Sequence, residues 1–453
     1  MIAFKAIEPL KPHMKFVKTY YRWWRYKQFY TDATLPAHEL DCPECGQRVS
    51  VPRLQQGEEA HCPTCGCDLV QVENNPYIAP LAFASAALIL MAFAYTMMYI
   101  TVTMPGVYSM LTLPEMMQNL VKQDFGFLAS VMFVLTFGTP FIFLILCVYV
   151  YTALIRNTVY PGLLYASRTL VRLRNWTMVD VFFISTLVAY IKLGSVAEVF
   201  FGPAFWLMLA LAVMLIRTSV SIPEHWVYYK IHIMMGQNAI QTASKDKICC
   251  SRCLYFRDSH EVTCGVCGAD LFRRRPKSLS TSLAFLLAAI VLYIPANLLP
   301  IMISSNPLTE QQNTILNGIV YMWNDGDKLI AAIIFSASIV VPAGKIISML
   351  FLLISAWQTP PLSAPKMTII YRLTEIVGRW SMIDVFVIII LMSAFHTPIA
   401  RVLPGPAAAY FCLVVLLTMF SAYFFDPRLI WDKFHQTDHN ALSHHAHTHE
   451  AEI

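Results

Sequence analysis

The sequence predicts an all-α polytopic membrane protein, built as a tandem parallel repeat of four transmembrane helices each, eight in total. Two small cytoplasmic zinc-ribbon domains complete the predicted fold. Three observations predict this class: a short motif occurs twice, apolar residues dominate the composition, and a cluster of paired cysteines precedes each half of the chain.

The repeated motif indicates that the chain is a tandem duplication. Residues 175–182 read NWTMVDVF and residues 379–386 read RWSMIDVF, and each copy opens a long apolar run. Further landmarks recur in the same order: Gly-Pro-Ala at residues 202–204 and 405–407, and prolines in two upstream apolar runs at Pro140 and Pro342. Self-similarity on this scale is typical of one structural unit that occurs twice.

Composition places most of the chain in lipid. Apolar residues make up 57% of the 453 residues and charged residues only 13%, whereas soluble proteins carry about a quarter. Runs of about eighteen or more apolar residues are typical of transmembrane helices. Eight such runs lie near residues 80–104, 126–154, 178–198, 201–220, 280–303, 329–356, 382–400 and 405–424.

Run length and flanking residues add two expectations. The second and sixth runs are longer than a bilayer requires, so we expect them to tilt or to extend beyond it. The fourth and eighth follow closely on Gly-Pro, which suits a tight turn between antiparallel helices.

The placement of Lys and Arg predicts the orientation. Basic residues gather before the first run and in every second loop after it, and the opposite loops carry little charge. Because cytoplasmic loops are enriched in Lys and Arg, both termini and both cysteine clusters are predicted to be cytoplasmic. An even number of spans in each half makes the repeats parallel rather than inverted.

These boundaries divide the chain into six segments. They are a basic and aromatic N-terminal segment (1–38), a first zinc ribbon (39–75), a first transmembrane repeat (76–221), a second zinc ribbon (245–276), a second transmembrane repeat (277–432) and a His-rich tail (433–453). The N-terminal segment suits an interfacial anchor on anionic headgroups, with a solvated basic tail as the alternative. The tail suits weak metal binding, with a disordered polar tail as the alternative.

Each cysteine cluster contains two C-x-x-C pairs. The predicted ligands are Cys42, Cys45, Cys62 and Cys65 in the first cluster, and Cys250, Cys253, Cys264 and Cys267 in the second. Two tight turns of this kind present four thiolates tetrahedrally, as structural Zn²⁺ requires. Iron is the competing metal, since softness and geometry alone do not separate the two. Cys249 is an alternative ligand in the second cluster.

Ionisable residues inside the apolar runs are the candidate functional residues, because a charge in hydrocarbon is costly. Lys345 lies in the middle of the sixth run, and Ser338 shares its helix face. In one hypothesis Lys345 pairs with Asp384 across the bundle, to couple protons or bind a polar headgroup. In the alternative, Lys345 snorkels to an interface.

Three further ionisable residues are secondary candidates: Asp180, Lys192 and His396. Asp180 and Asp384 share one position of the repeated motif, and Lys192 and His396 share another. Thr177-x-x-Asp180 and Ser381-x-x-Asp384 match a capping box, so helix capping is the alternative role for both aspartates.

Motifs for nucleotide chemistry are absent from the sequence. It contains no G-x-x-x-x-G-K-[ST] loop, no Rossmann fingerprint and no H-E-x-x-H. We therefore expect no enzymatic activity, and neither a nucleotide nor a nucleic acid as partner.

The cysteine clusters, the twice-written Trp-[Ser/Thr]-Met-x-Asp, the segment PANLLP at 295–300 and the paired Gly-Pro-Ala resemble the paraquat-inducible protein A family. The resemblance covers about residues 40–432 and looks strongest to its LetA and YebS type. It implies the inner membrane of Gram-negative bacteria, phospholipid as cargo, and a periplasmic MCE-domain tunnel protein of the LetB, PqiB or YebT type as partner. It also implies a transport cluster in the second repeat: Ser338, Lys345, Asp384 and Thr418. The first repeat departs from this pattern, since Phe143 stands where Lys345 stands in the second.

The resulting hypothesis is a lipid transporter component that passes phospholipid to or from the tunnel protein. That role would support lipid trafficking between the inner and outer membranes and envelope integrity. Two alternatives from other classes remain open. One is a non-transporting anchor or assembly factor for the MCE-domain protein, and the other is a membrane redox protein that uses cysteine-bound iron and haem.

Overall fold

The computed structural model describes residues 33–104, 107–193, 198–244, 246–306, 309–324, 326, 328–358, 362–394 and 401–434. Residues 1–32 of the N-terminal segment, His396 and residues 435–453 of the His-rich tail lie outside these ranges. The predictions made for them are therefore not addressed by the structure.

The first half of the chain alternates helices with short strands. In order, it contains α2 (Ala79–Thr96), β5 (Met98–Met104), β6 (Val107–Thr112), α3 (Leu113–Lys122), α4 (Gly126–Phe133), the π-helical η1 (Val134–Gly138), α5 (Thr139–Arg156), α6 (Leu163–Arg174), α7 (Val179–Leu193), β7 (Glu198–Phe201) and α8 (Pro203–Val220).

The second half repeats this order element by element. It contains α10 (Ser278–Leu298), β10 (Met302–Asn306), β11 (Thr309–Asn313), α11 (Ile315–Asn324), α12 (Lys328–Phe335), the π-helical η2 (Ser336–Val340), α13 (Val341–Trp357), α14 (Ala364–Trp380), α15 (Met382–Ala394), β12 (Arg401–Pro404) and α16 (Pro406–Phe424). The structure thus bears out the duplication of the sequence at the level of element order.

The matching prolines explain why both halves contain a π-helical segment. Pro140 and Pro342 occupy the first turn of α5 and α13, directly after η1 and η2. A proline ring clashes with the carbonyl four residues earlier in a regular helix. The wider turn avoids this clash, and Thr139 N–H bonds instead to Val134 O, five residues earlier.

Seven helices in the described part of the chain are long and apolar enough to cross a membrane, so the protein is a multi-pass membrane protein. They are Ala79–Thr96, Gly126–Arg156, Pro203–Val220, Ser278–Leu298, Ser336–Trp357, Ala364–Ser393 and Pro406–Phe424. The helix Gly126–Arg156 has 31 residues, or about 46 Å at 1.5 Å per residue, so it exceeds the bilayer core as expected. The structure does not confirm the predicted count of eight. Helix α7 has only 15 residues, and α15 continues α14 in one long apolar helix.

The all-α prediction is wrong in one respect, because each half also forms a three-stranded antiparallel sheet. The strand orders are β6-β5-β7 and β11-β10-β12. The first and fifth apolar runs were therefore predicted too long: the first (80–104) includes all of the central strand β5, and the fifth (280–303) extends into the start of the central strand β10. In β5 (MYITVTM) the buried Ile100 and Val102 alternate with Thr101 and Thr103, a strand period that average hydropathy hides.

The sheets also explain the repeated Gly-Pro-Ala. The turn joins a strand to the last helix of each half, not two helices as predicted from the sequence. A β-carbon on Gly202 would lie 2.2 Å from Met98 O, and one on Gly405 would lie 1.9 Å from Pro300 O. Only glycine permits this close approach of two backbones.

The cysteine clusters form small two-stranded hairpins. The first ribbon contains β1 (His38–Asp41), β2 (Arg48–Val51), β3 (Glu59–His61) and β4 (Asp68–Gln71); the second contains β8 (Lys247–Cys249) and β9 (Phe256–Asp258), and helix α9 (Glu224–Met234) precedes it.

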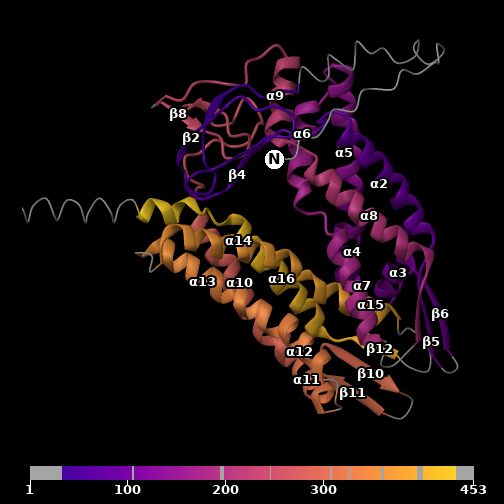
Figure 1. The fold of residues 1–453 in the computed structure, drawn as a ribbon. Coiled ribbons are helices and arrows are strands. Elements are labelled where there is room, and N and C mark those ends of the chain that lie inside the picture. Colours follow the sequence, from indigo (N-terminus) through magenta and orange to yellow (C-terminus); the bar gives the residue numbers. More distant parts are fainter. Residues whose placement is uncertain are drawn as a thin grey trace, which may run out of the picture.

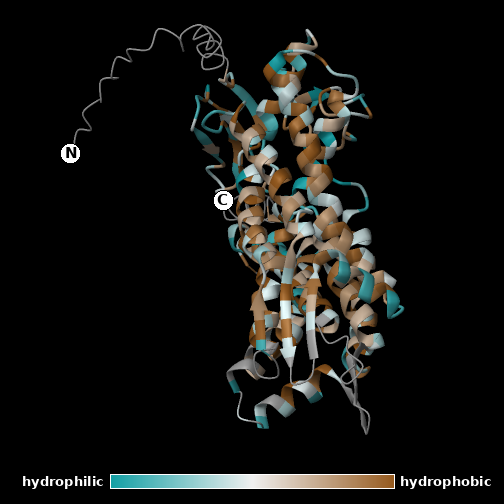
Figure 2. Ribbon diagram, turned by 90° about the vertical axis from the view of Figure 1, so that its right-hand side faces the viewer, coloured by the Kyte–Doolittle hydropathy of each residue, from teal (hydrophilic) through white to brown (hydrophobic). Residues whose placement is uncertain are grey.

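The two repeats meet along α7 and α15, with the ribbons at one end and the three-stranded sheets at the other (Figure 1). We call these ends the ribbon side and the sheet side. Phe182 and Phe386, from the two copies of the motif, pack edge to face with ring centroids 5.5 Å apart. Hydrophobic residues make up much of the helical bundle (Figure 2). Exposed ones such as Ile89, Trp206 and Ile347 leave apolar surface for lipid.

A buried ion pair fixes the chain just beyond α16. Arg428 donates to both carboxylate oxygens of Asp426, at 2.9 and 2.8 Å, and the two side chains are 9% and 3% exposed. Burial raises the pKa of Asp426, but the hydrogen bonds from Arg428 and from the backbone N–H of Arg275 outweigh it, so the pKa lies below its ordinary value.

We expect this pair to make stability sensitive to acid. Because the folded pKa lies below the unfolded value of about 4, the contribution is complete above that value and is lost as the pH falls through the folded pKa. Asp426→Asn leaves Arg428 buried without its charge partner, so it should lower the unfolding free energy by about 3 kcal/mol at pH 7. Thermal unfolding of the detergent-purified protein measures this, and the difference from wild type should narrow in acid. Equal unfolding midpoints at pH 7 would contradict the account.

Candidate functional site

The eight predicted cysteine ligands converge into two clusters on the ribbon side. In each cluster the four sulfurs lie within 4.8 Å of one another. The closest pairs, Cys42 with Cys65, Cys45 with Cys62, Cys250 with Cys267 and Cys253 with Cys264, are 3.6 Å apart. A tetrahedral ion with Zn–S bonds of about 2.3 Å places its sulfurs about 3.7 Å apart. The donor sets therefore fit one tetrahedral metal ion each.

The turns that hold the sulfurs use positive backbone φ angles. Gly46, Gly66 and Gly268 each follow the second cysteine of a pair, with φ of 74°, 66° and 64°. Each donates its N–H to the carbonyl of the first cysteine of that pair, at 2.7–2.9 Å. Leu254 fills the fourth such position with φ of 56°. Its side chain is 3% exposed, so burial offsets the unfavourable conformation.

The neighbouring cysteine is not part of the second cluster. Cys249 Sγ accepts a hydrogen bond from the backbone N–H of Asp41 at 3.4 Å, which joins the second ribbon to the first. Its role is thus a contact between the ribbons.

The first ribbon precedes the first repeat in sequence but grips the second repeat. Glu44, which lies between Cys42 and Cys45, accepts from Nε of Arg372 on α14 at 2.9 Å and also contacts its Nη2. The same guanidinium donates to Cys65 O at 3.1 Å. Folding of the first cysteine cluster therefore positions the carboxylate that holds α14.

The second ribbon contacts both halves of the chain: Arg252 donates to Tyr423 of α16 at 3.3 Å, and other residues contact α9 and α6. His225 and His232 of α9 hydrogen-bond through their rings to Cys253 O (3.1 Å) and Val266 O (2.9 Å). Arg168 of α6 approaches Gly268, where an added β-carbon would lie 3.3 Å from its Nη1. The two ribbons together therefore tie the repeats to each other.

Breaking the contact between the first ribbon and α14 should loosen the second repeat. Glu44→Ala removes charge-assisted hydrogen bonds that contribute about 2 kcal/mol, so we expect a lower unfolding midpoint in detergent. Glu39→Ala, at an exposed position of the same ribbon, is the matched control. A double-mutant cycle with Arg372→Ala should give a coupling energy of similar size, and no coupling would show that the contact is energetically neutral.

Inside the membrane-spanning part, the second repeat buries the four residues of the predicted transport cluster. Ser338, Lys345, Asp384 and Thr418 are 7%, 3%, 5% and 2% exposed. Ser338 lies in η2 and donates to Asp384 Oδ2 of α15 at 2.5 Å. This contact joins two helices of the repeat by a hydrogen bond to a carboxylate.

Lys345 has no such partner. Its Nζ is buried without a hydrogen-bond partner among the described residues, so the expected pairing with Asp384 is not formed. Neither does the side chain snorkel to an interface, because it is 3% exposed. It packs instead on Gly378 of α14, where an added β-carbon would lie 3.2 Å from Nζ. A buried ammonium without an acceptor is costly.

Thr418 and the two hydroxyl residues of the repeated motif form hydrogen bonds with nearby backbone carbonyls. Thr418 Oγ1 bonds back to Val415 O of its own helix at 2.9 Å. In the capping-box segments, Thr177 Oγ1 donates to Arg174 O and Ser381 Oγ donates to Val377 O, each in the preceding turn.

The secondary candidates do not form a comparable cluster in the first repeat. Asp180 faces Arg379 of the second repeat, 3.7 Å away, across the boundary between the repeats. The side chain of Lys192 and the whole of His396 lie outside the described residues. Phe143, which replaces Lys345, is fully buried. Among the described residues, the two repeats therefore share a fold, but the first repeat has no counterpart of the buried lysine and aspartate of the second.

Arg379 is a site residue that sequence reasoning missed. It opens the second copy of the motif where the first has Asn175, and it donates to Thr177 O at 3.3 Å. The signal in the sequence was the replacement of Asn175 of the first copy by Arg379 in the second. A charge that is added to an otherwise matching segment requires a partner.

Both repeats of the chain match a known protein family. The model of the family described as paraquat-inducible protein A matches residues 78–232 and again residues 279–435. These ranges coincide with the two structural repeats and cover more than half of the chain. The chain belongs to the paraquat-inducible protein A family.

Relatives with curated names agree with this assignment. "Intermembrane transport protein PqiA" of Escherichia coli (strain K12) is 32% identical over 416 residues, which cover 89% of this chain and 98% of PqiA. "Lipophilic envelope-spanning tunnel protein A" of the same strain is 29% identical over 394 residues, 86% of this chain and 90% of that protein. A "Probable intermembrane transport protein" of Haemophilus influenzae is 28% identical over 422 residues, 87% and 96% of the two chains. These identities do not favour the LetA and YebS type over PqiA, and no solved structure matches the chain.

Proposed function

We propose that this protein is an inner-membrane component of a lipid transport system that passes phospholipid to or from a periplasmic MCE-domain tunnel protein. The observation that carries the proposal is Lys345. Its buried ammonium lies within the membrane-spanning part of the second repeat and has no hydrogen-bond acceptor among the described residues. Proteins tolerate such a group where a ligand or a transported ion completes it.

The chemistry around Lys345 suits a phosphate-bearing lipid. Its ammonium donates three hydrogen bonds and attracts an anion. Asp384, held by Ser338, supplies a buried carboxyl group in the same repeat that can exchange a proton as the lipid enters or leaves. The names of the relatives, which refer to intermembrane transport and to an envelope-spanning tunnel, support lipid as the cargo.

The proposed topology has eight spans, with α6–α7 and α14–α15 as the third span of each repeat. The long helix Ala364–Ser393 supports this assignment for the second repeat, and the shared element order extends it to the first. The ribbons and both termini then lie in the cytoplasm, where thiolates stay reduced and Zn²⁺ is the proposed metal. The two sheets lie in the periplasm, where the tunnel protein docks.

A complementation assay tests the function in cells. In a strain that lacks the chain and shows a permeable envelope, wild type and Glu39→Ala should restore the barrier to a detergent, while Asp384→Asn should not, at equal amounts of membrane-inserted protein. Full restoration of the barrier by the double variant Asp384→Asn/Ser338→Ala would favour a non-transporting anchor for the tunnel protein.

A further inference from the structure

Three neighbouring cavities lie in this part of the molecule: one is lined by the first repeat alone and two lie between the repeats. The outer cavity, of about 580 Å³, lies between α3 and α4. The middle cavity, of about 460 Å³, lies between the α4–η1 helix of the first repeat and α16 of the second. The inner cavity, of about 300 Å³, lies between α14, α16 and the turn before α7.

Shared wall residues place the three cavities next to one another. Ser130 and Val134 line both the outer and the middle cavity. Trp176 lines both the middle and the inner cavity. We call the whole the inter-repeat groove. It runs from α3, next to the sheet side, to the turn before α7, on the ribbon side.

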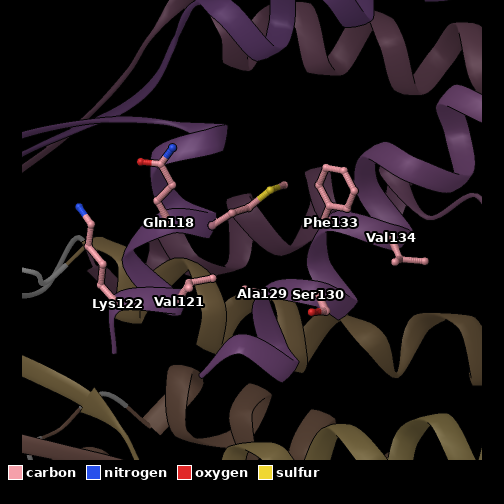
Figure 3. A pocket seen from close by; sticks show the side chains of 8 residues that line it. Gln118, Val121, Lys122, Ala129, Ser130, Phe133 and Val134 are labelled. Atoms are coloured by element: carbon pink, nitrogen blue, oxygen red, sulfur yellow. The ribbon is translucent and has the colours of Figure 1, made fainter. Parts of the chain in front are cut away.

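The wall of the groove is apolar along most of its length. Leu135, Leu416 and Phe420 line the middle cavity, and Val134 on η1 is 51% exposed. In the outer cavity Phe133 and Val134 lie across from α3 (Figure 3). Acyl chains match such a surface because they are as apolar as these side chains.

Cationic side chains stand at both ends of the groove. Lys122 lines the outer cavity beside Gln118 (Figure 3). At the ribbon side, Arg172 lines the middle cavity and Arg379 the inner one. Arg379 Nε is buried and has no acceptor among the described residues. Arg372 also lines the inner cavity but is held by Glu44, and Glu375 supplies a carboxylate there.

The inner cavity also touches the transport cluster. Gly378 forms part of its wall, and Lys345 Nζ packs against this same residue. A headgroup in the inner cavity would therefore contact the same glycine as the buried amine of Lys345, beside the side chain of Met419.

We propose that the inter-repeat groove binds a glycerophospholipid and forms its path between the two sides of the membrane. The phosphodiester sits at Arg379 and Arg172, and the acyl chains lie along η1 and α16. The lipid then reaches Lys122 at the sheet side. This inference rests on the proposed transport function and adds the route and the charge-bearing contacts to it.

Photo-crosslinking tests the groove in the full-length protein, reconstituted in nanodiscs of phosphatidylethanolamine and phosphatidylglycerol. The probe is phosphatidylglycerol with a diazirine on one acyl chain, and the crosslinked peptides are mapped by mass spectrometry. Wild type should crosslink preferentially at residues 127–139 and 416–420. Val134→Trp fills the groove and should abolish these crosslinks. Val213→Trp on α8, with a valine of similar exposure (49%), is the matched control and should retain them.

Arg172→Gln provides a second variant that leaves the groove open. It should lower crosslinking about tenfold, the effect of one lost charge-assisted hydrogen bond.

Crosslinks spread evenly over η1 and the outer face of α8 would show annular lipid only and overturn the proposal. So would normal lipid transfer by a folded Val134→Trp protein, in which case the transport function stands and the route is wrong. If wild type crosslinks in the groove but transfers no lipid, the groove stands as a binding site, while its role as a path fails with the proposed function.

Discussion

Lys345→Met is expected to make the protein more stable and unable to retain phospholipid. Methionine keeps the length of the side chain and removes a buried charge that has no acceptor among the described residues. Burial of an unpaired charge costs several kcal/mol, so the unfolding midpoint in detergent should rise. Retained phospholipid, counted by native mass spectrometry, should fall about 100-fold, because a desolvated charge-assisted hydrogen bond contributes about 3 kcal/mol to binding.

The combination of gained stability and lost binding separates a functional lysine from a structural one. Lys328→Met is the matched control, because Lys328 is an exposed lysine at the start of α12, in the same continuous helical segment. It should change neither quantity. A Lys345→Met protein that is less stable than wild type would mean that the lysine supports the fold, and the proposed site would be wrong.

Cys253→Ser is expected to abolish binding of one of the two proposed metal ions and to unfold the second ribbon. Small four-cysteine ribbons depend on metal to fold, since metal binding supplies much of their folding free energy. Cys253 is fully buried in the cluster, and its carbonyl accepts from the His225 ring. Loss of the ribbon therefore also removes contacts on α9 and should destabilise the protein by more than about 3 kcal/mol.

Elemental analysis measures this directly. Wild type should hold two zinc ions per chain and Cys253→Ser one, whereas Cys249→Ser should keep two, because Cys249 lies outside the cluster. Two ions retained by Cys253→Ser, or iron in the wild-type protein, would contradict the proposed zinc sites and reopen the redox alternative.

The sequence was most informative where a pattern repeats. The doubled motif, the paired prolines and the cysteine spacing predicted the duplication and both four-cysteine clusters. They did so because each reflects a local requirement: a π-helical turn before Pro140, or a positive φ at Gly46. Such requirements depend on few neighbours and therefore show in the sequence.

Features that depend on contacts between distant segments were not predictable in the same way. Hydropathy extended the first helix into β5, since a strand of apolar residues looks like more helix. Pairing of Lys345 with Asp384 was plausible from charge alone. In the structure Ser338 donates a hydrogen bond to the Asp384 carboxylate, and Lys345 packs on Gly378. The contact of the first ribbon with the second repeat depends on Glu44 and Arg372, which are 328 positions apart.

Lipid transfer in a reconstituted system tests the central claim most directly. Proteoliposomes carry labelled phosphatidylglycerol and either wild type, Lys345→Met or Lys328→Met, with the MCE-domain tunnel protein added on the sheet side, and the label that reaches the tunnel protein is counted. The account predicts that wild type and Lys328→Met load the tunnel protein and that Lys345→Met does not. Equal loading by Lys345→Met, or no loading by the wild-type protein, would contradict it.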